Sequence, residues 1–125
     1  MVRDSLDAVT ESVIGAFFEV ANSLGAGLLE KVYERALLRE LAIRGLRAEC
    51  QVPFGVVYKG ESVGDYFADI LVEGALLVEL KCVECLGVEH AAQCTTYLKA
   101  SGLTVCLLVN FRRSKVEWRR VVLGF

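Results

Sequence analysis

Three charged residues interrupt two apolar stretches near the middle of the chain, and their types could support metal chemistry. Asp69 lies within residues 66–71, whereas Glu79 and Lys81 lie within residues 75–81. In a strand, Glu79 and Lys81 share a face, because side chains two residues apart point the same way. Charges in a buried strand are costly unless they are paired, hydrogen-bonded or bound to a metal. Two interpretations follow: a metal site, or charges that emerge at a strand end and pair with their neighbours.

The turn between the two stretches favours the metal site. Glu73 and Gly74 predict a tight turn that would lay residue 69 beside residues 78 and 79. Asp69 and Glu79 would then be neighbours, and two ionised carboxylates so close repel each other unless a cation lies between them. Oxygen ligands suit Mg²⁺ or Mn²⁺ rather than Zn²⁺. The sequence therefore predicts a site for a hard divalent cation at one end of these strands.

Hydrophobic periodicity predicts the elements that position these residues. Apolar residues recur every three or four positions in the expected helices, and the expected strands are apolar runs bounded by turn residues. The helices are expected over residues 5–23, 28–44 and 88–100, and the strands over 49–58, 62–72, 75–82, 103–110 and 115–123. A helix between two strands implies a parallel pair beside an antiparallel hairpin. We expect an α/β fold, a mixed β-sheet flanked by helices in the order ααβββαββ.

The composition bounds the class of protein. A chain of 125 residues has the size of one domain, so we expect a single domain over residues 1–125. Apolar types make up 54% of the chain, which excludes disorder. No apolar run approaches the about 20 residues that a membrane-spanning helix needs, so no membrane association is expected. The apolar excess and the small size favour a homodimer.

Charge is distributed unevenly along the chain. The net charge of −2 gives no overall basic footprint for nucleic acid. Residues 112–125, however, contain one acid, Glu117, and five basic residues: Arg112, Arg113, Lys115, Arg119 and Arg120. This cluster is either the solvated face of a last strand or an edge that steers phosphate groups.

The cysteines raise a second metal hypothesis. Their number is odd and no signal peptide is recognisable at the start, so reduced thiols in a cytoplasm are expected. A spacing of C-x2-C-x4-H-x3-C, one residue short of a zinc knuckle, relates four residues: Cys82, Cys85, His90 and Cys94. Cys50 and Cys106 lie on expected strands, where they would be core residues.

The charged strand residues resemble a known motif. Asp69, nine further residues and then Glu79-Leu80-Lys81 are similar to the D-x(n)-E-x-K core of the PD-(D/E)XK nuclease superfamily. Ala68 stands where the superfamily's name has proline, and the aspartate that carries the chemistry is kept. The resemblance implies a restriction-endonuclease-like core.

A second segment is more specific. Residues Gly27-Leu-Leu-Glu30-Lys-Val-Tyr33 resemble the signature of the GxxExxY family, a small bacterial and archaeal branch of that superfamily. The segments around residues 17–20, 78–84, 90–98 and 107–111 are also similar, so the resemblance covers about residues 7–122.

The resemblance implies a metal-dependent nuclease that hydrolyses phosphodiester bonds, with DNA favoured over RNA. Asp69 and Glu79 would bind Mg²⁺ or Mn²⁺ together with the backbone carbonyl of Leu80. Glu30 would hold the ion directly or through water, and Lys81 would orient or activate the attacking water.

Two further residues enter through the same resemblance. Gln93 and Tyr97, four residues apart on one helix face, resemble the Gln-xxx-Tyr element of RecB-like nucleases and would contact substrate or support Lys81. The same spacing also suits a purely structural amphipathic helix. For the chain as a whole, the alternative function is a non-catalytic module that binds nucleic acid or a partner protein on this fold. A structural zinc protein built on the cysteines is the third possibility.

Overall fold

The computed structural model describes residues 3–112 and 115–123, and its elements follow the predicted order ααβββαββ. These elements are α1 (Arg3–Leu24), α2 (Glu30–Ile43), β1 (Ala48–Tyr58), β2 (Glu61–Val72), β3 (Leu76–Lys81), α3 (Val88–Ser101), β4 (Val105–Asn110) and β5 (Glu117–Val122). The last strand is shorter than the predicted 115–123, and Arg113 of the basic cluster lies outside the described residues.

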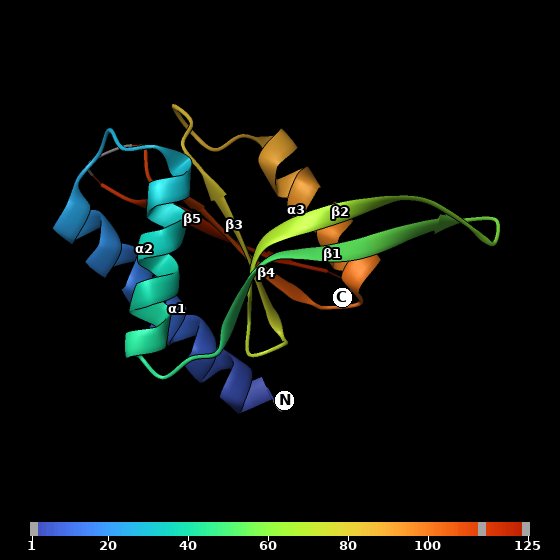
Figure 1. Cartoon of the computed structure of the whole chain (residues 1–125), viewed down its shortest axis with the longest axis horizontal. Helices are drawn as coiled ribbons and strands as arrows, with labels where there is room; N and C mark the ends of the chain where they lie inside the picture. The colour runs from blue at the N-terminus through green and yellow to red at the C-terminus, as the bar shows by residue number, and fades with distance from the viewer. Residues whose placement is uncertain (1–2, 113–114, 124–125) are drawn as a thin grey trace.

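The five strands form one mixed sheet in the order β1-β2-β3-β4-β5 (Figure 1). β3 and β4 run parallel and are connected through α3, whereas the other neighbouring strands are antiparallel. The predicted α/β fold with a mixed sheet is thus confirmed. Pro53 lies on the edge strand β1, where a residue without an N–H group is tolerated.

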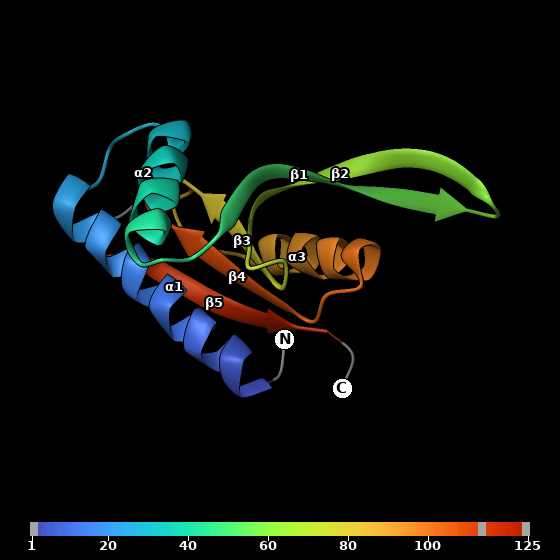
Figure 2. The same cartoon turned by 60° about the horizontal axis from the view of Figure 1, so that its bottom comes forward.

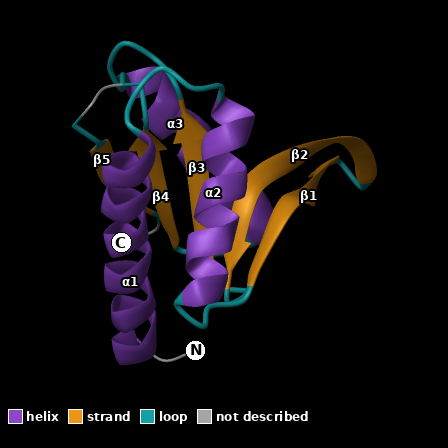
Figure 3. Ribbon diagram, turned by 60° about the vertical axis from the view of Figure 1, so that its left-hand side comes forward, coloured by secondary structure: helices purple, strands orange, loops and turns teal. Residues whose placement is uncertain are grey.

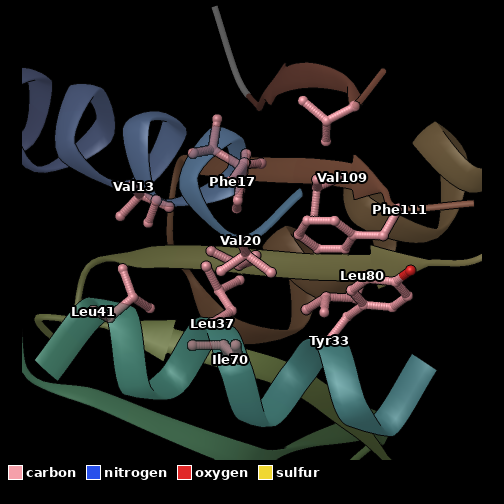
Figure 4. Packing of buried hydrophobic residues seen from close by; sticks show 14 of the residues in the cluster. Val13, Phe17, Val20, Tyr33, Leu37, Leu41, Ile70, Leu80, Val109 and Phe111 are labelled. Carbon is pink, nitrogen blue, oxygen red and sulfur yellow. The ribbon is translucent and has the colours of Figure 1, made fainter. Parts of the chain in front are cut away.

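Helices cover both faces of the sheet. α1 and α2 lie over one face and α3 lies over the other (Figure 3). Phe17 and Leu37 pack against Leu80 and Val109 in the first layer (Figure 4). Each fully buried side chain of this kind contributes about 1.5–3 kcal/mol. β3 and β4 are covered on both faces, which explains why their sequences are almost continuously apolar.

The sheet splits where β2 leaves β3. These strands are paired only from Ile70↔Val78 to Val72↔Leu76. Before Ile70, β2 is paired with β1 alone, and the two strands form a curved arm that passes over α3 and extends beyond it (Figure 2). Ala68 packs in the core beneath α3 and Ile70 in the core beneath α1 and α2, although residues two apart normally share a face. The strand therefore turns over at Asp69, at the mouth of the split.

Tyr33 fixes the loop that leads into α2. Its hydroxyl donates to the carbonyl oxygen of Gly25 at 2.6 Å and accepts the N–H of Leu28 at 3.2 Å. Its ring stacks on Phe111 with centroids 4.9 Å apart. Gly27 has a φ of 99°, which a residue with a side chain rarely adopts. The glycine and the tyrosine of the G-x-x-E-x-x-Y segment thus both set where Glu30 enters the helix.

Replacing Tyr33 by phenylalanine is expected to lower the free energy of unfolding by about 1–2 kcal/mol, because the ring stays and the hydroxyl's two hydrogen bonds are lost. Urea denaturation followed by circular dichroism measures this change. Tyr58→Phe, at the exposed end of β1, is the matched control and should change stability by less than about 0.5 kcal/mol. Equal stability of Tyr33→Phe and the parent chain would contradict the role given to this hydroxyl.

The structure also bears on the question of membrane association and on the burial of two cysteines. Within residues 3–112 and 115–123, no helix is long and apolar enough to cross a membrane. Cys106 is buried as predicted, but the prediction for Cys50 is wrong, since this residue is exposed. Cys50 lies on β1, the edge strand, where only β2 is a neighbour in the sheet.

Candidate active site

Asp69 and Glu79 meet at the split between β2 and β3, and the predicted turn at Glu73 and Gly74 brings them there. The main-chain N–H of Asp69 donates to Oε1 of Glu79 at 3.2 Å. The N–H of Leu80 donates to Oδ2 of Asp69 at 2.8 Å. The two carboxyl groups also hydrogen-bond to each other, so one of them carries a proton.

That proton belongs to Glu79 at neutral pH. Burial, with a further contribution from the Asp69 carboxylate, raises the pKa of Glu79 to about 9. Burial also raises the pKa of Asp69, but the N–H of Leu80 and the hydrogen bond from Glu79 oppose that rise. Two carboxyl groups in contact cannot both ionise cheaply. Asp69 and Glu79 therefore hold one proton between them, and a cation could bind in place of that proton.

Lys81 lies on the same face of β3 as Glu79, at the end of the strand. Burial raises the pKa of Glu30 and of Asp69, and the Lys81 ammonium partly offsets the rise in both groups. The ion pairs formed within the described ranges do not include Lys81. The ammonium thus acts on Glu30 and Asp69 without forming an ion pair in the described residues. This differs from the alternative interpretation of the sequence, in which the charges at the strand end pair with their neighbours.

Glu30 approaches the same place from the first turn of α2. Its carboxylate accepts a hydrogen bond from the N–H of Cys82, the residue that follows β3. Burial raises the pKa of Glu30, and repulsion from Asp69 adds to the rise. The first turn of α2 therefore brings Glu30 within electrostatic range of Asp69 and Lys81.

Two residues that the sequence did not single out complete this side. Glu34, one helical turn after Glu30, is buried and forms an ion pair with Lys31 at 3.3 Å. Nε2 of Gln51 lies 3.5 Å from Oε2 of Glu34 and 3.5 Å from Oδ1 of Asp69, and so makes long hydrogen bonds to both. The i, i+4 spacing of Glu30 and Glu34 places both carboxylates on one helix face, so the sequence could have indicated Glu34 as a site residue. No pattern in the sequence indicates Gln51.

Gln93 and Tyr97 border the acids from α3. The two side chains hydrogen-bond to each other. Burial, followed by the charges of Glu79 and Asp69, raises the pKa of Tyr97 to about 12. The Tyr97 ring also packs edge-on against Tyr66 of the arm, with centroids 5.3 Å apart. All the predicted site residues therefore lie around the split in the sheet.

The zinc hypothesis is wrong for this arrangement. Cys94 is buried and hydrogen-bonds to Cys106, whereas Cys85 is exposed. Nδ1 of His90 accepts the N–H of Gly87 at 2.8 Å. In the part of the chain that is described, no three His, Cys, Asp or Glu side chains are grouped so as to hold a metal ion as they stand. The same finding applies to the acidic site: Asp69 and Glu79 are neighbours, but Glu30 is not grouped with them as a third metal ligand.

Known proteins share this fold. The model of a family described as the PD-(D/E)XK nuclease superfamily matches residues 7–121. The crystal structure of SSO0001 has 16% sequence identity and a TM-score of 0.62, and the match covers 76% of this chain and 50% of that chain. The alkaline exonuclease LHK-Exo from Laribacter hongkongensis has 18% identity and a TM-score of 0.55, with 75% and 55% covered. No curated protein matches the chain.

This chain spans about half the length of the solved structures that it matches. At these identities the likeness concerns the fold, and it confirms the predicted restriction-endonuclease-like arrangement.

Proposed function

Because the chain belongs to the PD-(D/E)XK nuclease superfamily, we propose that it is a single metal-dependent nuclease domain with Asp69, Glu79, Lys81 and Glu30 in its active site. The observation that supports this most is a set of three acids, Glu30, Asp69 and Glu79, whose pKa values are raised chiefly by burial, with the charge of Asp69 adding to the rise in the other two. Such a set is unfavourable without a bound cation. It lies near Lys81, which forms no ion pair within the residues that the structure describes.

The donors fit Mg²⁺ or Mn²⁺, because hard divalent cations prefer carboxylate and carbonyl oxygens. Asp69 and Glu79 would be ligands together with the carbonyl oxygen of Leu80, and Glu30 would hold the ion directly or through water. Binding would displace the proton that Asp69 and Glu79 share, so affinity should rise with pH. When bound, such an ion polarises a phosphoryl oxygen and lowers the pKa of a water.

The remaining steps fall to side chains of this chain. Lys81 would orient the attacking water and stabilise negative charge that develops on the phosphate oxygens. Since its pKa is about 12, Tyr97 keeps its proton at neutral pH and can donate a hydrogen bond to substrate. Gln93 would hold the Tyr97 hydroxyl in place, because the two side chains are hydrogen-bonded.

The finer assignments belong to the same proposal. The positive φ of Gly27, the position of Glu30 and the hydrogen bonds of Tyr33 support membership of the GxxExxY branch, since each named residue has a distinct role. We propose DNA over RNA as the substrate, a cytoplasmic location for the reduced thiols, and a homodimer or partner protein. Sizing chromatography of the purified chain tests the last point.

Metal-dependent cleavage is the first expected result. With Mg²⁺ or Mn²⁺, the chain should cleave duplex DNA, single-stranded DNA or RNA, and EDTA should abolish cleavage. Asp69→Asn should lower the rate by about 100-fold or more, because it removes a charged ligand from the ion. Asp65→Asn, four residues earlier on the exposed part of β2, is the matched control and should cleave as the parent does. Cleavage that survives both EDTA and Asp69→Asn would show that the activity comes from elsewhere.

A second function is favoured by the arm. Its exposed apolar residues, Val57 at 67%, Val63 at 59% and Phe67 at 51%, offer a surface that could bind a partner without turnover. Salt-sensitive binding of DNA with no cleavage in any divalent metal, and no effect of Lys81→Ala, would support this non-catalytic module instead.

A further inference from the structure

A cavity of about 400 Å³ lies where α2 begins, with Glu30 in its wall. We call it the Arg112 cavity, and its lining residues are Gly27, Leu28, Leu29, Glu30, Cys82 and Arg112. Glu30 connects it to the proposed active site, because this carboxylate interacts with Asp69 and Lys81 and accepts the N–H of Cys82. Ligand pockets commonly have volumes of about 300–1,000 Å³, so the cavity can hold part of a substrate.

The strand ladder places Arg112 in this cavity. β3 and β4 stay in parallel register as far as Lys81↔Asn110. One residue further, the N–H of Phe111 donates to the carbonyl oxygen of Lys81 at 3.0 Å. The N–H of Arg112 then donates to Oδ1 of Asn110 at 3.1 Å. The backbone of Arg112 is thus fixed beside the residue that follows Lys81.

Asn110 holds this strand end together. Its side chain is 1% exposed, and its amide forms two hydrogen bonds with Val83, accepting the N–H at 3.1 Å and donating to the carbonyl at 2.8 Å. It also donates to Oε1 of Glu117 at 3.2 Å. A buried and fully used amide of this kind is rigid, so it is a positioning residue for Arg112 and for the end of β3.

The guanidinium of Arg112 is available for a ligand. Arg112 is exposed, and no ion pair within the described ranges involves it. Arg119, from the same basic cluster, instead donates to the carbonyl of Leu86 at 3.2 Å and lies 3.9 Å from Glu117. Leu29, next to Glu30, is 77% exposed and adds an apolar surface to the lining.

We propose that the Arg112 cavity binds the nucleotide next to the scissile phosphodiester, with Arg112 on its phosphate and Leu28 and Leu29 against its sugar or base. This inference rests on the proposed nuclease function and adds a substrate subsite to it. A guanidinium matches the geometry and charge of a phosphate. A basic residue here also counters the repulsion that Glu30 exerts on a nucleic-acid backbone.

The test compares Arg112→Ala and Arg112→Lys with a matched control, Arg120→Ala, which removes an exposed arginine of β5 outside the cavity. Binding of one fluorescein-labelled DNA oligonucleotide, single-stranded and as a duplex, is measured by anisotropy in Ca²⁺ at several KCl concentrations. Arg112→Ala should weaken binding by about five- to tenfold and reduce the slope of log K against log salt by about 0.7 for single strands or 0.9 for duplex. Arg112→Lys should restore the slope with lower affinity.

Cleavage kinetics give an independent readout. Arg112→Ala should raise KM by about tenfold while kcat changes by less than about threefold, because the residue acts on substrate binding. If Arg112→Ala and Arg120→Ala have the same affinity and salt slope, or if neither DNA form binds, the cavity inference is overturned. If DNA binds but no metal supports cleavage, the nuclease proposal fails, and the binding comparison still decides whether Arg112 contacts phosphate.

Discussion

Replacing Lys81 by methionine is expected to lower the single-turnover rate of cleavage by about 100- to 1,000-fold. Methionine keeps the unbranched apolar stem of lysine and removes the ammonium group. That ammonium lies near Asp69 and Glu30, where it is proposed to stabilise charge on the phosphate. Because Lys81 is not part of an ion pair in the described ranges, the fold should be kept. Thermal denaturation checks the fold, and quenched-flow assays with excess enzyme measure the rate.

Lys99→Met is the matched control for this prediction. Lys99 is exposed in the last turn of α3, and its replacement should leave the rate within about twofold of the parent. Lys81→Arg should recover only part of the rate, because the charge returns with a different shape and position. If Lys81→Met cleaves within about tenfold of the parent, the catalytic role of this lysine is lost.

The second large effect concerns the stability of the metal-free protein. Glu79→Gln is expected to raise the free energy of unfolding at about pH 8 by about 2–5 kcal/mol, because each pKa unit corresponds to about 1.4 kcal/mol. In the unfolded chain the carboxyl group ionises above its ordinary pKa of 4.5, whereas in the folded chain it stays protonated up to about 9. Glutamine keeps the hydrogen-bonding shape of the protonated acid, and it does not ionise in the folded or the unfolded chain.

The sign of the pH dependence follows from the same values. The folded state of the parent holds a proton that the unfolded state has lost, so stability falls as pH rises from about 5 to 9. Glu79→Gln should lose most of that slope, and its advantage should shrink toward about pH 5. Urea denaturation in EDTA across this range measures both, with Glu61→Gln at the exposed start of β2 as the control. A parent stability that is flat with pH, or a Glu79→Gln that is less stable at high pH, would refute the buried-proton account.

In Mg²⁺, the parent chain should become more stable to unfolding than Glu79→Gln, the reverse of the order expected without metal. The parent gains stability from any ion that binds only its folded state, and Glu79→Gln should gain much less. The acid that costs stability without metal is thus the one through which metal would stabilise the fold.

The sequence predicted the fold and the meeting of Asp69 with Glu79 because these depend on local signals. Helical and strand periodicity set the element order, and the turn residues Glu73 and Gly74, with φ values of 53° and 65°, set the register that brings residue 69 to residue 79. The parallel pairing of β3 with β4 followed from the helix between them. What these signals share is that they act over a few neighbouring residues.

The features that the sequence did not predict depend on contacts between distant segments. Gln51 has a φ of 52°, although it is neither glycine nor asparagine, and it lies opposite Asp69, where β2 turns over. The place of Arg112 depends on the register of β3 against β4 and on the amide of Asn110. The zinc-like spacing misled because Cys94 points into the core beneath α3, toward Cys106.

The amide of Asn110 connects β5 to the loop that follows Lys81, although the two segments lie far apart in the sequence. Glu117 accepts from this amide and from the N–H of Leu86, so a residue near the C-terminal end secures the loop that follows Lys81. The loop after Lys81 is therefore secured only once β5 has been synthesised, after the segment that contains Asp69, Glu79 and Lys81.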